Sequence, residues 1–328
     1  MKKVLAIAAI ILCCASVAPP SSAAPTPPHV PKVAFLGAST AEQAGHLLKA
    51  FKQGLRDLGY EEGKNIVIVT RFADGQLDRL PALAAELVAL KVDVIFTPPT
   101  VAVHAARKAT QTIPIVFALV ADPVGAGFVQ SLARPGGNIT GLSTINVELG
   151  AKRLELLKEA FPKVMHVAVI YNPDDSANVL QFTQTEQAAK VLAVRLLPLA
   201  VKKPDEFAPA FARMQREGAD ALIVMENPVS FTIRNAVVAL AGKHRLPAMY
   251  ALKEFVDAGG LMSYSVNSAE QFRSAATYVD KILKGAKPGD LPVQQPTRIE
   301  MSVNLKTAEA QGFKFSPSLL LRADQVIQ

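Results

Sequence analysis

Cysteine and tryptophan are nearly missing from this sequence of 328 residues, which contains two cysteines and no tryptophan. Cys13 and Cys14 are adjacent, and neither has a histidine or a carboxylate beside it. The Cα atoms of neighbouring residues lie closer together than a normal disulfide requires. The cysteine content therefore excludes a disulfide-stapled fold and a cysteine-based metal site.

The motifs of phosphate-binding and hydrolytic enzymes are also missing. The chain has no G-x-x-x-x-G-K-[ST] loop and no G-x-S-x-G elbow, and Gly125-Ala126-Gly127 lacks the third glycine of a dinucleotide-binding fingerprint. The five histidines are scattered, and no two of them have the spacing of metal ligands. We therefore expect no metal, no cofactor and no enzymatic activity.

Positive charge exceeds negative charge, but it does not gather in one place. The formal net charge is +7, and the basic residues are spread over predicted helices, for example at Lys49, Lys52 and Arg56. A nucleic-acid-binding surface would show a basic run interleaved with aromatic residues, and none occurs. We therefore expect no nucleic-acid partner.

The first residues have the pattern of an export signal. Lys2 and Lys3 precede a short apolar run over Val4–Leu12, and a small-residue stretch at Ser22–Ala24 offers a cleavage site after Ala23 or Ala24. A buried N-terminal helix is the alternative, but several prolines follow at once. We predict a signal peptide over residues 1–24, a proline-rich tether over 25–31, and a periplasmic location.

Lipidation of Cys13 or Cys14 would explain why both cysteines stand at the end of the apolar run. The small residue expected before a lipidated cysteine is absent, because Leu12 precedes Cys13 and Cys13 precedes Cys14. Cleavage at Ala23 or Ala24 would instead remove both cysteines. The sequence leaves these two alternatives open.

From Val33 onward, short apolar runs alternate with amphipathic helices. The longest of these runs, Ile113–Val120, is rich in valine and isoleucine without alternation, which is typical of a parallel strand covered on both faces. Repeated strand–helix alternation predicts right-handed βαβ units and parallel sheets. The alternation restarts after a helix over Glu148–Phe161, and this indicates two Rossmann-like lobes of the α/β class.

Polar residues follow two predicted strands of the first half. Ser39 and Thr40 come after the strand Val33–Gly37, and Thr97 and Thr100 lie at the end of the strand Val92–Thr97. In open parallel sheets, ligands bind at the carboxyl ends of the strands, where helix N-termini offer free N–H groups. These four residues either bind a ligand carboxylate or cap their helices.

Candidates for a ligand cation lie elsewhere along the chain. Asp122 follows Ile113–Val120 and either receives an ammonium group or caps the next turn. In the second half, Asn172 follows one strand, and Glu226 and Asn227 follow another. Tyr250 offers a flat face that either stacks on an apolar ligand group or packs in the core.

Several segments resemble one known family. DPVGAGFVQSLARPGGNITGLS, over residues 122–143, is similar to the hallmark segment of the ABC transporter substrate-binding family that includes tryptophan- and phenylalanine-binding lipoproteins. GLRDLGYEEGKNI, ENP and EMSVNLKTAEAQGF extend the resemblance to the C-terminus. It implies a type I periplasmic-binding-protein fold, with hinge strands near Ile145 and Leu261. The predicted lobes are therefore residues 32–144 plus 262–328, and residues 145–261.

The resemblance implies an exported receptor that closes two lobes around a small molecule and delivers it to an ABC permease. The ligand expected is an amino acid with an aromatic or branched side chain, or a related small carboxylate, and the receptor is expected to be a monomer. A ligand-sensing module of a signalling system is the alternative function, and an exported α/β enzyme is a weaker one.

Overall fold

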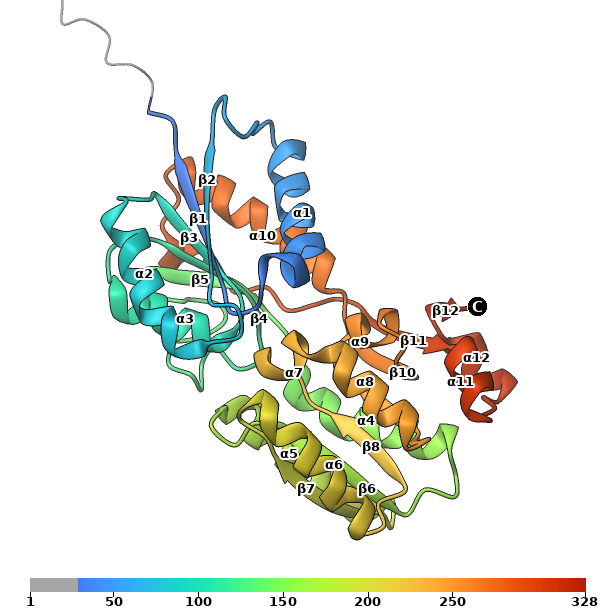
Figure 1. The fold of residues 1–328 in the computed structure, drawn as a ribbon. Coiled ribbons are helices and arrows are strands. Elements are labelled where there is room, and N and C mark those ends of the chain that lie inside the picture. The colour runs from blue at the N-terminus through green and yellow to red at the C-terminus, as the bar shows by residue number, and fades with distance from the viewer. Residues whose placement is uncertain (1–28) are drawn as a thin grey trace, which may run out of the picture.

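The computed structural model describes residues 29–328 of the chain. They form two lobes, each built around a mainly parallel β-sheet with helices on both faces (Figure 1). The predicted α/β class with two Rossmann-like lobes is therefore confirmed. The predicted signal peptide, both cysteines and residues 25–28 of the predicted tether lie outside the described residues. No helix in the described part is both long enough and apolar enough to cross a membrane.

The first lobe has a five-stranded sheet with the strand order β2-β1-β3-β4-β5, and all of its strands are parallel. Its elements are β1 (Lys32–Gly37), α1 (Ala41–Asp57), β2 (Val67–Phe72), α2 (Leu80–Ala89), β3 (Val94–Thr97), α3 (Thr100–Ala109), β4 (Ile115–Val120), β5 (Ile139–Ser143) and α10 (Ser268–Leu283).

The second lobe has a seven-stranded sheet with the order β12-β11-β10-β9-β8-β6-β7, in which only the β10–β11 pair is antiparallel. Its elements are α4 (Asn146–Ala160), β6 (His166–Tyr171), α5 (Ser176–Val191), β7 (Arg195–Ala200), α6 (Phe207–Arg216), β8 (Ala221–Val224), α7 (Pro228–Thr232), α8 (Arg234–Lys243), β9 (Ala248–Tyr250), α9 (Lys253–Asp257), β10 (Met262–Val266), β11 (Ile299–Asn304), α11 (Leu305–Gln311), α12 (Pro317–Arg322) and β12 (Gln325–Ile327).

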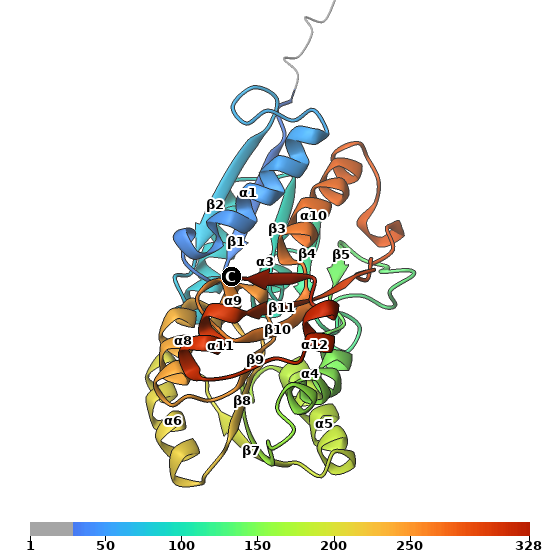
Figure 2. The same ribbon diagram turned by 90° about the vertical axis from the view of Figure 1, so that its right-hand side faces the viewer.

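The end of the chain departs from the predicted lobe boundaries. Residues 262–328 were expected to complete the first lobe, but β10, β11 and β12 extend the second sheet. β10 pairs in parallel with β9, and the buried Met262, Met301 and Val303 pack into the core of the second lobe. Helix α10, between β10 and β11, lies beside α1 on the first lobe (Figure 2). The segment after α10 also joins the first lobe, where Gln294 pairs with Leu142 of β5 and Val293 enters the core. The assignment of these strands to the first lobe is therefore corrected.

Side chains from alternate positions of each strand enter cores on opposite faces of the sheet. In β1, Ala34 and Leu36 pack toward α2 and α3, whereas Val33 and Phe35 pack toward α1 and α10. In β6, Ala168 and Ile170 face one core and Val167 and Val169 face the other. Burial on both faces explains why the strands read as continuous apolar runs.

Two segments beside the strands have irregular backbone. The helical segment after β8 is divided into α7 and α8 at Ile233. The segment after Asp122 is a series of turns, in which Gly127 has a φ of 68° that ends any helical run.

Candidate functional site

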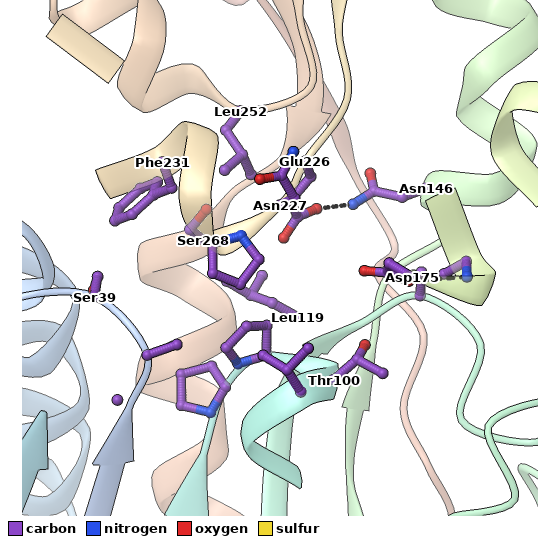
Figure 3. A pocket seen from close by; sticks show the side chains of 18 of the residues that line it. Ser39, Thr100, Leu119, Asn146, Asp175, Glu226, Asn227, Phe231, Leu252 and Ser268 are labelled. Atoms are coloured by element: carbon purple, nitrogen blue, oxygen red, sulfur yellow. Dashed lines mark hydrogen bonds between the residues drawn. The ribbon is translucent and has the colours of Figure 1, made fainter. Parts of the chain in front are cut away.

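A cleft between the lobes lies where both sheets reverse their strand order. In the first sheet this point separates β1 from β3, and in the second it separates β6 from β8. Ligands in open α/β sheets bind at such switch points, beyond the carboxyl ends of the strands. The loops after β1, β3, β6 and β8 all line the cleft, together with the first residues of α4, α5 and α10 (Figure 3).

The wall from the second lobe is polar and carries two carboxylates. Glu226 follows β8, and Asp175 caps the N-terminus of α5 by accepting hydrogen bonds from the N–H groups of Ala177 and Asn178. Burial raises the pKa of both carboxyls, and that of Glu226 rises to about 8. The other polar side chains on this wall are amides, namely Asn146, Asn178, Gln181 and Asn227.

A buried arginine stands behind Glu226 and acts on it through an amide. Arg153 has no exposed surface, and its Nη2 donates to Oδ1 of Asn146 over 2.8 Å. This bond directs the Nδ2 group of Asn146 toward Glu226, whose Oε2 accepts from it. Burial lowers the pKa of Arg153 to about 10, so the guanidinium remains charged at neutral pH. Its attraction opposes the effect of burial on the pKa of Glu226.

The same arginine ties three parts of the second lobe together. Nε of Arg153 donates to the carbonyl oxygen of Tyr264 in β10 over 2.7 Å, and Nη2 also donates to that of Ala251 over 3.2 Å. Gln181 of α5 donates to the carbonyl oxygen of Asn146 over 2.8 Å. These bonds hold the start of α4 in place against β10, α5 and the loop after β9.

The wall from the first lobe is mostly apolar. Phe35, Leu47, Leu119 and Phe272 line it, and the hydroxyl groups of Ser39, Thr100 and Ser268 are its polar side chains. Helix α3 begins on this wall at Thr100, and no side chain caps it. The N–H group of Ala102 donates to the carbonyl oxygen of Pro99 over 2.9 Å. The N–H groups of Thr100 and Val101 take no partner among the described residues, and they are therefore available to an anion.

An irregularity in β4 places Leu119 on the cleft wall. The pairing of β4 with β5 shifts between Phe117 and Val120, and Leu119 has a φ of 56°. On the neighbouring strand, a Cβ atom at Gly141 would lie 2.1 Å from the carbonyl oxygen of Phe117. Only glycine at position 141 allows the two strands to approach this closely.

Four of the predicted site residues lie on the cleft walls, namely Ser39, Thr100, Glu226 and Asn227. Asn227 also caps a helix, because its side chain accepts a hydrogen bond from the N–H of Ser230 in α7. Its Nδ2 group is buried and takes no partner among the described residues.

The structure places the other predicted residues away from the cleft. Thr40 caps α1 in a capping box with Gln43, Asp122 accepts from the N–H of Gly125 over 2.7 Å, and Asn172 accepts from the N–H of Asp174. Thr97 donates to the carbonyl oxygen of Leu36, and Tyr250 stacks on Phe255 in the core of the second lobe. For these five residues, capping or core packing accounts for the side chain.

Sequence reasoning missed several residues of the polar wall, namely Asn146, Asp175, Asn178 and Gln181, and also the buried Arg153 behind it. Asp175 could have been found, because it follows a strand and precedes a helix. Gln181 and Arg153 lie inside helices and carry no signal in the sequence.

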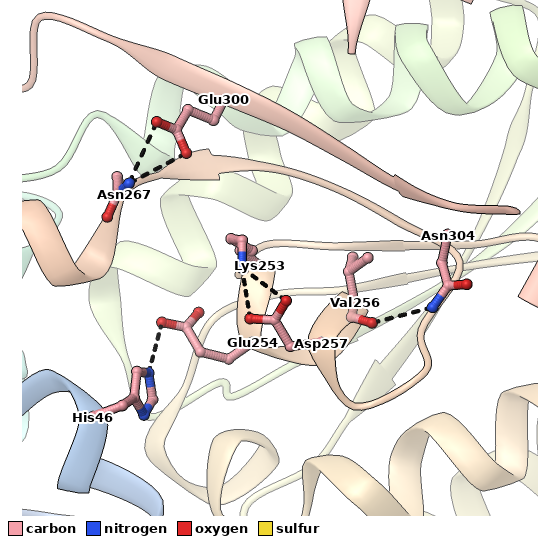
Figure 4. A network of polar contacts seen from close by, with 8 residues as sticks. All are labelled: His46, Lys253, Glu254, Val256, Asp257, Asn267, Glu300 and Asn304. Carbon is pink, nitrogen blue, oxygen red and sulfur yellow. Dashed lines mark hydrogen bonds and ion pairs between the residues drawn. The ribbon is translucent and has the colours of Figure 1, made fainter. Parts of the chain in front are cut away.

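The two lobes also touch beside the cleft. Nε2 of His46 in α1 lies 3.6 Å from Oε1 of Glu254 in α9 (Figure 4). Burial disfavours the charge on Glu254, but the contact with His46 and hydrogen bonds to the carboxylate hold the pKa of Glu254 below its usual value. Gln43 of α1 donates to the carbonyl oxygen of Thr232 at the end of α7. These contacts join the first lobe to the second beside the cleft.

Comparisons with known proteins agree with this architecture. The family model for ABC transporter substrate binding proteins matches residues 41–327. A tyrosine-binding protein of Clostridioides difficile is 28% identical over 263 residues, which cover 80% of this chain and 75% of that protein. Each of these matches covers most of the chain.

Two solved structures cover 91% of this chain with a TM-score of 0.85. One is a conserved domain protein from Vibrio cholerae, which is 28% identical. The other is an ABC domain from Streptococcus pneumonia in complex with L-Trp, which is 25% identical. In both cases the match covers 100% of the solved chain. The fold is that of type I periplasmic binding proteins, as expected.

Proposed function

This chain belongs to the ABC transporter substrate-binding protein family, and we propose that it is an exported receptor that closes around an amino acid and delivers it to an ABC permease. The observation that carries this proposal is the pairing of opposite chemistries across one cleft. Carboxylates lie on the wall of the second lobe, and a free helix N-terminus lies on the wall of the first. An amino acid carries an ammonium and a carboxylate on one carbon, so it can engage both walls at once.

The polar groups suit the two ends of such a ligand. The carboxylates of Glu226 and Asp175 are acceptors for the ammonium group. The hydroxyl groups of Ser39 and Thr100 and the first N–H groups of α3 are donors to the carboxylate. A ligand that bridges the lobes stabilises the closed form over any form in which the lobes are apart.

The apolar wall indicates the side chain of the ligand. Phe35, Leu47 and Phe272 lie on the first lobe, and Phe231 and Leu252 face them from the second. Burial of an aromatic or branched side chain among them supplies affinity in proportion to its apolar area. The named ligands of two relatives, tyrosine and L-Trp, support the same class.

Transport would follow from closure. Proteins of this family are extracytoplasmic solute receptors, and a receptor with its ligand enclosed presents both lobes to a permease in one fixed arrangement. Within this proposal the receptor is a periplasmic monomer.

A thermal-shift screen of the twenty amino acids, followed by calorimetry on those that raise the melting temperature, tests the ligand class. Aromatic or branched amino acids should raise the melting temperature most, because a ligand that binds only the folded state stabilises it. If no amino acid binds, the proposed ligand class is wrong.

A further inference from the structure

The charged side chains that line the cleft all have the same sign, which is negative. Asp175 and Glu226 are the only charged residues that line it, and the lining contains no lysine, arginine or histidine among the described residues. The one cation behind this wall, Arg153, is buried and reaches the cleft only through the amide of Asn146. The cleft is therefore built to receive positive charge.

Both carboxylates retain an oxygen for a ligand. Oε2 of Glu226 accepts from Asn146, and Oδ1 of Asp175 accepts from the N–H groups of Ala177 and Asn178. The remaining oxygens, Oε1 of Glu226 and Oδ2 of Asp175, accept no hydrogen bond within the described part of the chain. Both carboxyls line the same cleft, and they lie close enough for the charge of Asp175 to raise the pKa of Glu226. A primary ammonium group has three donors, so one group has enough donors for both carboxylates.

A ligand carboxylate would find weaker partners. On the first lobe it meets neutral hydroxyl and N–H groups, and the amides on the wall of the second lobe are also neutral. Loss of a hydrogen bond between neutral groups costs less binding free energy than loss of the partner of a buried charge. The two ends of an amino acid should therefore contribute unequally to binding.

We infer that the amino group is the essential recognition element of the ligand, bound by Asp175 and Glu226 together, and that primary amines with an apolar body and no carboxylate also bind in this cleft. This inference rests on the proposed function and narrows it. Phenethylamine and tyramine are amines of this class, and 3-phenylpropionate is the matching acid without the amino group.

Isothermal titration calorimetry with three matched ligands tests the inference. Phenylalanine, phenethylamine and 3-phenylpropionate share one side chain and differ only in the charged groups. Phenethylamine should bind within about tenfold of phenylalanine, whereas 3-phenylpropionate should bind at least about a hundredfold more weakly than phenylalanine. The series is repeated with tyrosine, tyramine and 3-(4-hydroxyphenyl)propionate, because the proposed function does not fix the side chain.

Two isosteric variants show which groups are responsible. Glu226→Gln removes one charge, and Asp175→Asn removes the other while asparagine keeps a good helix cap for α5. Each should weaken phenethylamine binding at least about tenfold and leave 3-phenylpropionate binding no weaker than before. Glu62→Gln makes the same chemical change on the surface of the first lobe, beside Lys52, and should leave both affinities unchanged.

The outcomes separate the inference from the proposed function. If the amino acid binds and the acid binds as tightly as the amine, the receptor assignment stands and the inference is overturned. Unchanged amine affinity in both carboxylate variants overturns it as well. If neither amino acid series gives any binding, the proposed ligand class fails, and the inference fails with it.

Discussion

Arg153 and Glu226 do not touch, yet the amide of Asn146 joins them. The amide oxygen of Asn146 accepts from the guanidinium, and its NH₂ group donates to the carboxylate. The arginine thereby orients the carboxylate and favours its charged form without entering the cleft. A side chain in the interior of a helix thus sets the chemistry of a site that it does not line.

Substitution of Arg153 should weaken ligand binding, because it changes the protonation of Glu226. Arg153→Leu removes the attraction that favours the carboxylate, so the pKa of Glu226 should rise further and ligand affinity at pH 7 should fall, with partial recovery at higher pH. The variant should also lose roughly 1–3 kcal/mol of stability, because backbone carbonyl oxygens that accept from Arg153 lose their donor. Calorimetry between pH 6 and 9 and urea denaturation measure the two effects. A uniform loss of affinity at every pH would point to structural damage instead.

Binding should also depend on pH in the unmodified protein. Because the pKa of Glu226 is raised to about 8, most of this carboxyl is protonated at neutral pH in the empty cleft. A ligand ammonium group favours the charged form, so binding releases a proton. Affinity should therefore rise with pH by up to roughly tenfold per unit and level off above pH 8. Calorimetry in buffers of different ionisation enthalpy counts the proton, and identical heats in all buffers would contradict this.

The same raised pKa predicts a conflict between binding and stability. The pKa of Glu226 is higher in the folded protein than in the unfolded chain. Its ionisation therefore lowers the stability of the folded protein as pH rises from about 4.5 to about 8. Glu226→Gln removes this loss, so the ligand-free variant should melt no lower than the wild type at pH 7 and higher at pH 9. Its ligand affinity should fall about ten- to a hundredfold. A lower melting temperature at both pH values would show that burial of Glu226 is not costly.

The contact between His46 and Glu254 should favour closure without touching the ligand. His46→Ala leaves a buried carboxylate without its partner from the other lobe, so the closed form should lose stability and ligand dissociation should become several-fold faster. Stopped-flow measurement of ligand release tests this. Lys253→Ala is the matched control, because among the described residues Lys253 pairs with Asp257 alone, within α9 (Figure 4). Equal release rates in both variants would contradict a closing role for His46.

The close approach of β4 and β5 predicts one strongly destabilising substitution. At position 141 a Cβ atom would meet the Phe117 carbonyl oxygen, and the φ of 154° is itself unfavourable for alanine. Gly141→Ala should therefore lower the free energy of unfolding by roughly 2 kcal/mol or more. Gly137→Ala is the control, since its Cβ would meet nothing within 4 Å. Urea denaturation compares the two, and equal stabilities would contradict the close contact.

The location of the cleft could be predicted from the sequence, because polar residues after parallel strands must gather at one edge of each sheet. Which of two adjacent polar residues faces the cleft could not be predicted. Ser39 lines the cleft whereas Thr40 caps α1, and Thr100 lines it whereas Thr97 bonds to Leu36. Within a loop, one backbone dihedral angle decides whether a side chain caps the helix or faces the cleft. The residue types alone do not specify this angle.

The polar network and the last strands were beyond sequence reasoning for a different reason. Arg153 and Asn146 are seven positions apart, but Glu226 and Tyr264 reach them only through the tertiary fold. Strands β10, β11 and β12 look like any other strand in the sequence, and nothing in a strand marks which sheet it joins. The resemblance to a family gave the fold but placed these strands in the wrong lobe.

Closure of the two lobes around an amino acid is the central claim, and small-angle X-ray scattering tests it most directly. Scattering profiles of the wild-type protein are compared without ligand and with a saturating amino acid whose affinity calorimetry has established. The account predicts that the ligand shifts the population from open to closed forms and decreases the radius of gyration. An unchanged profile at saturation would contradict it.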